Sequence, residues 1–290
     1  MIIDSFMGLA SLIISILGLV KDGVYEQGTV EMKIWAGQDR GHGGFLPSVQ
    51  IRDTAGDIQG DHNSGNTWLE YNEMKTFPVK MRKNSEPKII QIHAQNAWSF
   101  QDFSCIAAIG WTPSNSLPPV NEPNKRRGVI PGDLVTFCGG AWDYSGQESH
   151  YAELRCAWVG MRSHISGTIR TLVINTDIIS DRNSPNLDGD RETYCYWGTS
   201  MEFSQLTGPP RNAGLRQARI EHNEDFGNRV RIHKSLSAIQ LCDDPMSWGS
   251  SFYSIDEGIL CDMSTKTKIP ICKEGQDSRV GQCFEYNKPS

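Results

Sequence analysis

The chain has 290 residues and a formal net charge of −6, and 38% of its residues are hydrophobic. This length accommodates one large domain or two modest ones, and the composition excludes a disordered chain. The negative net charge argues against a nucleic-acid partner, because proteins that bind nucleic acids present clustered positive charge.

An apolar run without charges, Ser5–Val20, follows Asp4 at the start of the chain. As a helix it would reach about 24 Å, which is shorter than the roughly 30 Å core of a bilayer, so we expect no stable membrane span. The run is typical of a signal peptide over residues 1–20, although no Lys or Arg precedes it. Two alternatives stay open, namely a buried or lipid-seeking helix and a retained membrane anchor.

Short segments rich in β-branched and aromatic residues follow Gly28, and their apolar patterns predict strands. In chain order the predicted strands cover residues 29–35, 48–53, 77–81, 88–94, 105–111, 133–139, 153–159, 168–175, 193–198 and 229–233. Because segment 105–111 is nearly all apolar, we expect it at the centre of the core. Turn-forming residues separate the segments, which predicts a mainly β, antiparallel β-sandwich or jelly-roll-like domain over residues 28–196.

The remainder of the chain has a different character. Residues 197–234 form a polar connecting segment, in which 215–224 predicts a short helix. Residues 235–290 are a cysteine-rich C-terminal extension that begins with a Ser-capped helix over 237–244 and contains a hairpin around 264–267. This extension has little apolar mass, so we expect disulfides to hold it on the sheet.

The eight cysteines show no Cys-x-x-Cys spacing and no histidine within a few residues. Zinc sites and thioredoxin-like centres normally have that close spacing, so we interpret the cysteines as disulfide-bonded. Disulfides need an oxidising compartment, which favours a secreted protein. The pairing stays open for Cys105, Cys138, Cys156, Cys195, Cys242, Cys261, Cys272 and Cys283.

One segment, Arg40–Phe45, contains the His-Gly-Gly pattern of a lipase oxyanion loop. That loop acts beside a serine in a Gly-x-Ser-x-Gly elbow, and the sequence has no such elbow. We therefore interpret Arg40–Phe45 as a glycine-rich hairpin turn. The sequence identifies no catalytic residue.

Two acidic loops offer the oxygen ligands that Ca²⁺ prefers. The first contains Asp181, Asp188 and Asp190, and the second contains Asp53 and its acidic neighbours up to residue 61. Neither loop has the EF-hand spacing, and a hydrated loop is the alternative in both cases. Calcium at the first loop is the one cofactor that we consider.

Tryptophans in polar loops are candidates for ligand binding, because an exposed indole ring can stack on a sugar face. Trp68, Trp98 and Trp142 lie among Asn, Asp, Ser and Gly residues, so we select them as candidate binding residues. The alternative is that these rings close the end of the sandwich.

Four segments together resemble secreted β-rich proteins of filamentous fungi that have no established activity. The segments are VEMKIWAGQ (30–38), QIRDTAGDIQG (50–60), CIAAIGWT (105–112) and LCDMSTKTKIPIC (260–272). The resemblance implies export and a β-rich fold, and it implies no catalytic residue.

These observations favour a secreted, non-catalytic binding protein whose partner is a glycan or a component of a host or cell surface. A secreted hydrolase with an unrecognised site is the first alternative. A membrane-active toxin or effector that keeps its apolar N-terminus is the second. The oligomeric state stays open.

Overall fold

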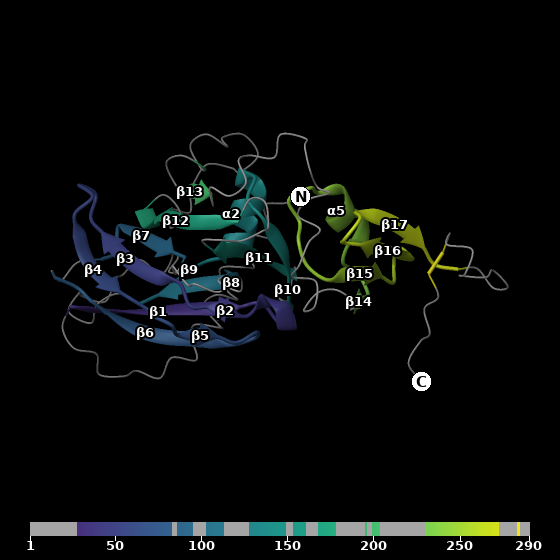
Figure 1. Ribbon diagram of the computed structural model, residues 1–290. Coiled ribbons are helices and arrows are strands. Elements are labelled where there is room, and N and C mark those ends of the chain that lie inside the picture. Colours follow the sequence, from purple (N-terminus) through teal and green to yellow (C-terminus); the bar gives the residue numbers. More distant parts are fainter. Residues whose placement is uncertain are drawn as a thin grey trace. The chain divides into compact units, whose positions relative to one another are not determined.

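The computed structural model describes residues 28–82, 86–94, 103–112, 128–148, 153–160, 168–177, 195, 199–203, 230–272 and 283–284. The chain divides into two compact units, an N-terminal unit (Met1–Arg211) and a C-terminal unit (Asn212–Ser290). Both are built mainly from strands (Figure 1), which confirms the predicted fold class. Among the described residues, no helix is long and apolar enough to cross a membrane. The apolar run 5–20 and the predicted helix 215–224 lie outside the described residues.

One large sheet dominates the N-terminal unit, with the strand order β4-β3-β7-β12-β11-β8-β1-β6. Three further strands pair with members of this path: β10 with β11, β13 with β12 and β9 with β8. The strands of the sheet are β1 (Thr29–Ala36), β3 (Ser48–Arg52), β4 (Ile58–His62), β6 (Met74–Lys80), β7 (Ile89–His93), β8 (Phe103–Trp111), β9 (Gly128–Val129), β10 (Trp142–Glu148), β11 (Glu153–Gly160), β12 (Ile169–Asn175) and β13 (Thr199–Phe203). Neighbouring strands are antiparallel except β11 and β12, which are parallel.

The two ends of this strand order meet, so the sheet is nearly barrel-shaped. A bridge joins Gly60 at β4 to Met81 just after β6, and the Arg82 N–H donates to the Gln59 carbonyl at 2.5 Å. A Cβ on Gly60 would lie only 2.7 Å from the Lys80 carbonyl oxygen, so glycine permits this close approach. The closure pairs strand edges that would otherwise be exposed.

Apolar side chains on alternate positions fill the interior of this sheet. Strand β8 is buried along almost its whole length, which confirms that it lies at the centre of the core. Strand β1 is also buried on both faces. The largest fully buried side chains include Trp142, Trp158, Met32, Ile34, Ile51, Ile90, Ile92, Ile106 and Leu154.

Residues 133–139 are predicted as a strand, but residues 133–138 are helical and Gly139 ends the helix. Helix α2 covers Pro131–Cys138, with proline in its first turn, and ends at Gly139 in the left-handed conformation (φ 85°). Proline at the start and glycine just after the end are strong helix boundary signals. They outweigh the β-branched and aromatic residues between them, which misled the prediction.

The C-terminal unit has its own four-stranded sheet, in which β14 is parallel to β15 and the other pairs are antiparallel. Its elements are β14 (Val230–His233), α5 (Ala238–Asp243), β15 (Ser251–Ser254), β16 (Ile259–Asp262) and β17 (Thr267–Pro270). The Ser237 hydroxyl caps α5 by accepting from the Gln240 N–H at 2.9 Å, as predicted. Leu241 of the helix and Phe252 of β15 are buried, and Tyr253, which points to the opposite face of β15 from Phe252, is buried beside Phe284.

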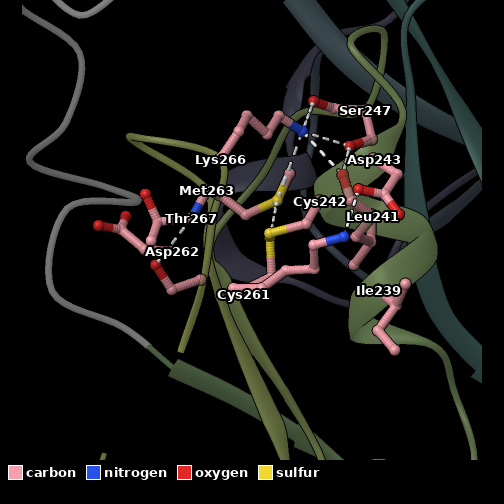
Figure 2. The surroundings of a disulfide bond; sticks show 12 residues. Ile239, Leu241, Cys242, Asp243, Ser247, Cys261, Asp262, Met263, Lys266 and Thr267 are labelled. Carbon is pink, nitrogen blue, oxygen red and sulfur yellow. Dashed lines mark hydrogen bonds and ion pairs between the residues drawn. A yellow bond between two sulfur atoms is a disulfide. The ribbon is translucent and has the colours of Figure 1, made fainter. Parts of the chain in front are cut away.

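The end of α5 is completed by a lysine side chain (Figure 2). The Lys266 ammonium donates to the carbonyl oxygens of Leu241 at 3.0 Å and Ser247 at 2.7 Å, and also to the Ser247 hydroxyl. A helix leaves its last carbonyls without intrahelical partners, and a cation there also suits the helix dipole. Lys266 therefore stabilises the turn that follows α5.

All eight cysteines form disulfides, as predicted. The N-terminal unit contains Cys105–Cys156 and Cys138–Cys195, and the C-terminal unit contains Cys242–Cys261 and Cys272–Cys283. Each bond thus joins two residues of one unit. The disulfides of the C-terminal unit tie its own elements together, where we expected them to hold it on the larger sheet.

Candidate ligand-binding surface

A short two-stranded ribbon of the N-terminal unit presents aromatic side chains at the surface. Its strands are β2 (Gly44–Phe45) and β5 (Trp68–Leu69), and Phe45 pairs directly with Trp68. The two rings meet edge to face with their centroids 5.3 Å apart. Leu69 is fully buried whereas Trp68 is 36% exposed, so the ribbon rests on the core and leaves the indole accessible.

A tight turn after β5 adds a second exposed aromatic side chain. The Glu73 N–H donates to the Glu70 carbonyl at 3.1 Å, and Asn72 takes a left-handed conformation (φ 56°) that asparagine tolerates well. Tyr71 at the tip of this turn is 43% exposed. We call Phe45, Trp68 and Tyr71 the aromatic surface.

Charged groups beside the aromatic surface hold the turn. The Glu73 carboxylate accepts from the Glu70 N–H at 2.8 Å and pairs with the Lys75 ammonium at 2.6 Å. The hydrogen bond from Lys75 is the main reason why the pKa of Glu73 lies below its ordinary value. Glu73 therefore stays ionised at neutral pH and keeps the turn closed.

Polar groups also precede the ribbon. The Asn63 side chain accepts from the Gly65 N–H at 2.9 Å, and the Thr67 N–H donates to the Ser64 carbonyl at 3.0 Å. Asn66 and Thr67 are exposed immediately before Trp68. An accessible ring with amide and hydroxyl groups nearby is an arrangement that can contact both the apolar face and the hydroxyls of a sugar.

A buried hydrogen bond between a histidine and an aspartate anchors the segment that leads into the ribbon. In the short 3₁₀ helix η1 (Arg40–His42), the His42 Nε2 atom lies 3.0 Å from Asp143 Oδ2, and neither side chain is exposed. The Asp39 N–H donates to His42 Nδ1 at 3.3 Å, so Nδ1 acts as an acceptor and Nε2 carries the proton that is donated to Asp143. The Trp158 ring packs edge to face against the imidazole.

The glycines around His42 allow close packing. A Cβ on Gly37 would lie 2.2 Å from His42 Nδ1, and one on Gly44 would lie 2.0 Å from the Phe103 carbonyl oxygen. The prediction of a glycine-rich hairpin turn over Arg40–Phe45 is therefore wrong. The segment is a 3₁₀ turn followed by β2, because the buried imidazole and not a tight turn determines its path.

The three predicted tryptophans have different locations. Trp68 lies at the surface, as a binding residue must, and Trp98 lies outside the described residues. Trp142 is fully buried in β10, where its ring contacts Tyr144 and the Arg155 guanidinium lies 4.7 Å from its centroid. The choice of Trp142 as a surface residue is thus wrong, because its polar neighbours in sequence belong to a strand that enters the core.

The acidic loops give no metal site among the described residues. Asp181, Asp188 and Asp190 lie outside these residues. The Asp53 carboxylate accepts from the N–H groups of Ala55 and Asp57 and from the Gln59 amide, which shapes the turn between β3 and β4. In the described part of the chain, the one group of three metal-ligand side chains is His42, Cys105 and Cys156.

Sequence reasoning missed Phe45, Tyr71 and the pair of His42 with Asp143. Tyr71 stands between Glu70 and Asn72, a turn signal that could have drawn attention to it. No sequence signal joins His42 to Asp143, because 101 positions separate the two residues.

Comparisons with known proteins add little. No family model matches the chain, and no curated protein matches it. Two solved structures with partial similarity are titled "Crystal structure of Delta413-417:GS I805W LOX" and "Anaerobic crystal structure of delta413-417:GS LOX in complex with arachidonate". They are 15% and 14% identical to this chain over 35% of it, each with a TM-score of 0.25. The chain spans about 15% of the length of each, and likenesses this weak carry no argument about fold or function.

Proposed function

We propose that this chain is an exported, non-catalytic protein that binds a glycan through the aromatic surface. The observation that carries the proposal is the exposure of Trp68, a large ring held at the surface by its partner Phe45. Leaving such a ring in water costs free energy that a ligand regains when it covers the ring.

A glycan fits this chemistry better than a purely apolar ligand. A sugar ring has one face of C–H groups that packs on an aromatic ring, and its hydroxyls need hydrogen-bond partners. Asn66, Thr67 and Glu70 are exposed next to the aromatic surface and can supply such partners. The ribbon is also rigidly supported, since Leu69 is buried and the Ser104 hydroxyl donates to the Phe45 carbonyl. Rigid support reduces the entropy cost of binding.

Export is supported by the cysteines. Four disulfides with no free cysteine are typical of an oxidising environment. The apolar run at residues 5–20 and the resemblance to secreted fungal proteins agree with this proposal. Mass spectrometry of the native N-terminus tests it, because a chain that keeps its first 20 residues would contradict cleavage of a signal peptide.

Binding is tested first with the wild-type protein on a glycan array and on insoluble polysaccharides. We expect retention on at least one glycan class. A Trp68→Ala variant should lose about 5- to 30-fold in affinity for that glycan, since stacking on an indole contributes on the order of 1–2 kcal/mol.

The matched control is Ile239→Ala, because Ile239 is 39% exposed and belongs to the C-terminal unit. This variant should bind as the wild-type protein does. Absence of any retention, or equal binding by both variants, would contradict the proposal.

A further inference from the structure

Three side chains of the N-terminal unit place metal-ligand atoms close together in its core. The ring nitrogen of His42 and the sulfur atoms of Cys105 and Cys156 all lie within 4.8 Å of one another, and all three residues are buried. His42 Nδ1 lies 4.0 Å from the Cys156 sulfur. The two sulfurs form a disulfide, so they are not thiolate ligands in the oxidised protein.

We propose that reduction of Cys105–Cys156 creates a binding site for one soft or borderline cation such as Zn²⁺. The ligands are the two thiolates and His42 Nδ1, and an external molecule such as water completes a tetrahedron. Two thiolates with one imidazole are a ligand set that zinc uses in proteins, and thiolates disfavour hard cations such as Mg²⁺ or Ca²⁺. The inference is independent of the proposed glycan binding.

The histidine is already oriented for this role. Its Nε2–H donates to the buried Asp143 carboxylate, so Nδ1 is unprotonated and carries the lone pair that a metal ion needs. Metal-bound histidines typically donate their other ring N–H to such a carboxylate, which fixes the tautomer and raises the basicity of the ligand. The competitor for Nδ1 is the Asp39 N–H at 3.3 Å, a long hydrogen bond that is easily given up.

The backbone holds the two cysteines at a compatible separation. Cys105 in β8 and Cys156 in β11 lie on neighbouring strands, with their Cα atoms 5.3 Å apart. Zinc–sulfur bonds of about 2.3 Å require the two sulfurs to move to roughly 3.8 Å from each other. Because the Cα atoms are already close, we expect rotation of the cysteine side chains to achieve this separation without moving the strands apart.

The reaction is balanced with a low-molecular-weight thiol as the reductant. Two R–SH molecules reduce the cystine to two cysteine thiols and form one R–S–S–R disulfide. Binding of Zn²⁺ then releases the two thiol protons to solvent and forms two zinc–thiolate bonds. The metal and the disulfide are therefore alternatives, and bound metal should slow re-formation of the disulfide.

The first experiment compares two variants with the same number of cysteines. Cys105→Ala/Cys156→Ala lacks the site, whereas Cys138→Ala/Cys195→Ala lacks the other disulfide of the same unit. After reduction, each protein is titrated with Cd²⁺, and thiolate-to-cadmium absorption and native mass spectrometry are recorded. We expect the control variant to bind one Cd²⁺ more than the site variant, and equal binding would overturn the proposal.

The second experiment uses the wild-type chain, so it does not depend on how a variant folds. The reduced protein is reoxidised with oxidised glutathione with or without Zn²⁺, then alkylated and mapped by mass spectrometry. We expect Zn²⁺ to slow formation of Cys105–Cys156 at least tenfold, with Cys138–Cys195 much less affected. If Zn²⁺ leaves the rate of Cys105–Cys156 unchanged, or slows both bonds alike, the proposal is wrong.

A third measurement separates the metal site from simple burial of thiols. Asp143→Asn should weaken Zn²⁺ binding by about 10- to 100-fold, because the histidine loses the carboxylate that orients it. Near-ultraviolet circular dichroism of the oxidised variant checks that the core is intact. An intact variant with unchanged Zn²⁺ affinity would remove Asp143 from the proposal.

Discussion

The two units differ in what stabilises them. The N-terminal unit buries a large apolar interior inside a nearly closed sheet, with whole tryptophan side chains removed from water. The described part of the C-terminal unit has one small helix on a four-stranded sheet, and it adds two short-range disulfides and the Lys266 ammonium on backbone carbonyls. Hydrophobic stabilisation grows with the size of the core, so a small unit depends on cross-links and on satisfied polar groups.

The largest expected effect is on the core of the N-terminal unit. Trp158 is fully buried and contacts both His42 and Phe103. Trp158→Ala should lower the free energy of unfolding of this unit by about 3–5 kcal/mol, through lost burial and a cavity. Hydrogen exchange read by mass spectrometry checks the result unit by unit. Equal loss of protection in the C-terminal unit would show that the two units do not keep separate cores.

A carboxyl group in α2 gives the N-terminal unit a distinct pH dependence. The carboxyl group of Asp133 is buried, although other atoms of the residue are partly exposed. This burial raises the pKa of the carboxyl from 3.8 to about 6, and the nearby Arg155 guanidinium offsets only part of the increase. The folded state thus holds a proton that the unfolded chain releases near pH 4. Stability should fall as pH rises from about 4 to 6, and the loss is complete above that window.

Asp133→Asn removes the loss of stability that occurs between about pH 4 and 6. We expect the variant to gain up to about 3 kcal/mol of unfolding free energy at pH 7, at about 1.4 kcal/mol per pKa unit, and little at pH 4. Urea unfolding at both pH values measures the difference. A gain of equal size at both would show that the carboxyl does not titrate in this window.

The C-terminal unit should respond to pH with the opposite sign. Partial burial alone would raise the pKa of Asp262, but hydrogen bonds from Ser264 and Thr265 outweigh it, and the pKa lies below 3.8. The contribution of Asp262 is therefore present above about pH 4 and is lost as pH falls through its lowered pKa. Asp262→Asn removes this contribution of Asp262 to stability, so its pH dependence is the one to compare with that of Asp133→Asn.

The smallest expected effect concerns the lysine at the end of α5. Lys266→Met keeps the length of the side chain but removes the ammonium that donates to the Leu241 and Ser247 carbonyls, although the Leu241 carbonyl still accepts from the Ser247 hydroxyl. We expect a loss of about 1–2 kcal/mol confined to the C-terminal unit, since a methionine side chain packs where the lysine stem lay. Faster hydrogen exchange in α5, with the N-terminal unit unaffected, is the outcome to look for. An unchanged exchange rate would mean that water replaces the ammonium without cost.

The sequence was most informative where local pattern and tertiary contacts agree. Alternation of apolar residues and local capping residues predict many of the regular elements. These elements are the strands β1, β3, β7, β8, β11 and β12, the Ser237 cap and the hairpin of β16 and β17. Helix α2 was missed because its apolar, partly β-branched interior resembles a strand, although its flanking Pro131 and Gly139 mark a helix.

The candidate site was harder to predict because it depends on contacts between distant segments. Trp68 and Trp142 both stand among polar residues, yet one is at the surface and the other is in the core. Only the pairing of β10 with β11 separates the two cases. The same holds for His42 and Asp143, which are joined by the fold of the sheet and by no local motif.

The pairing of the cysteines has a consequence for proteolysis. No disulfide links a residue of one unit to a residue of the other, and every cysteine is paired. The only covalent connection between the units is therefore a single stretch of main chain. One protease cut between Cys195 and Cys242 would sever it and yield two fragments, each with its cystines intact, that separate on a denaturing gel without a reducing agent.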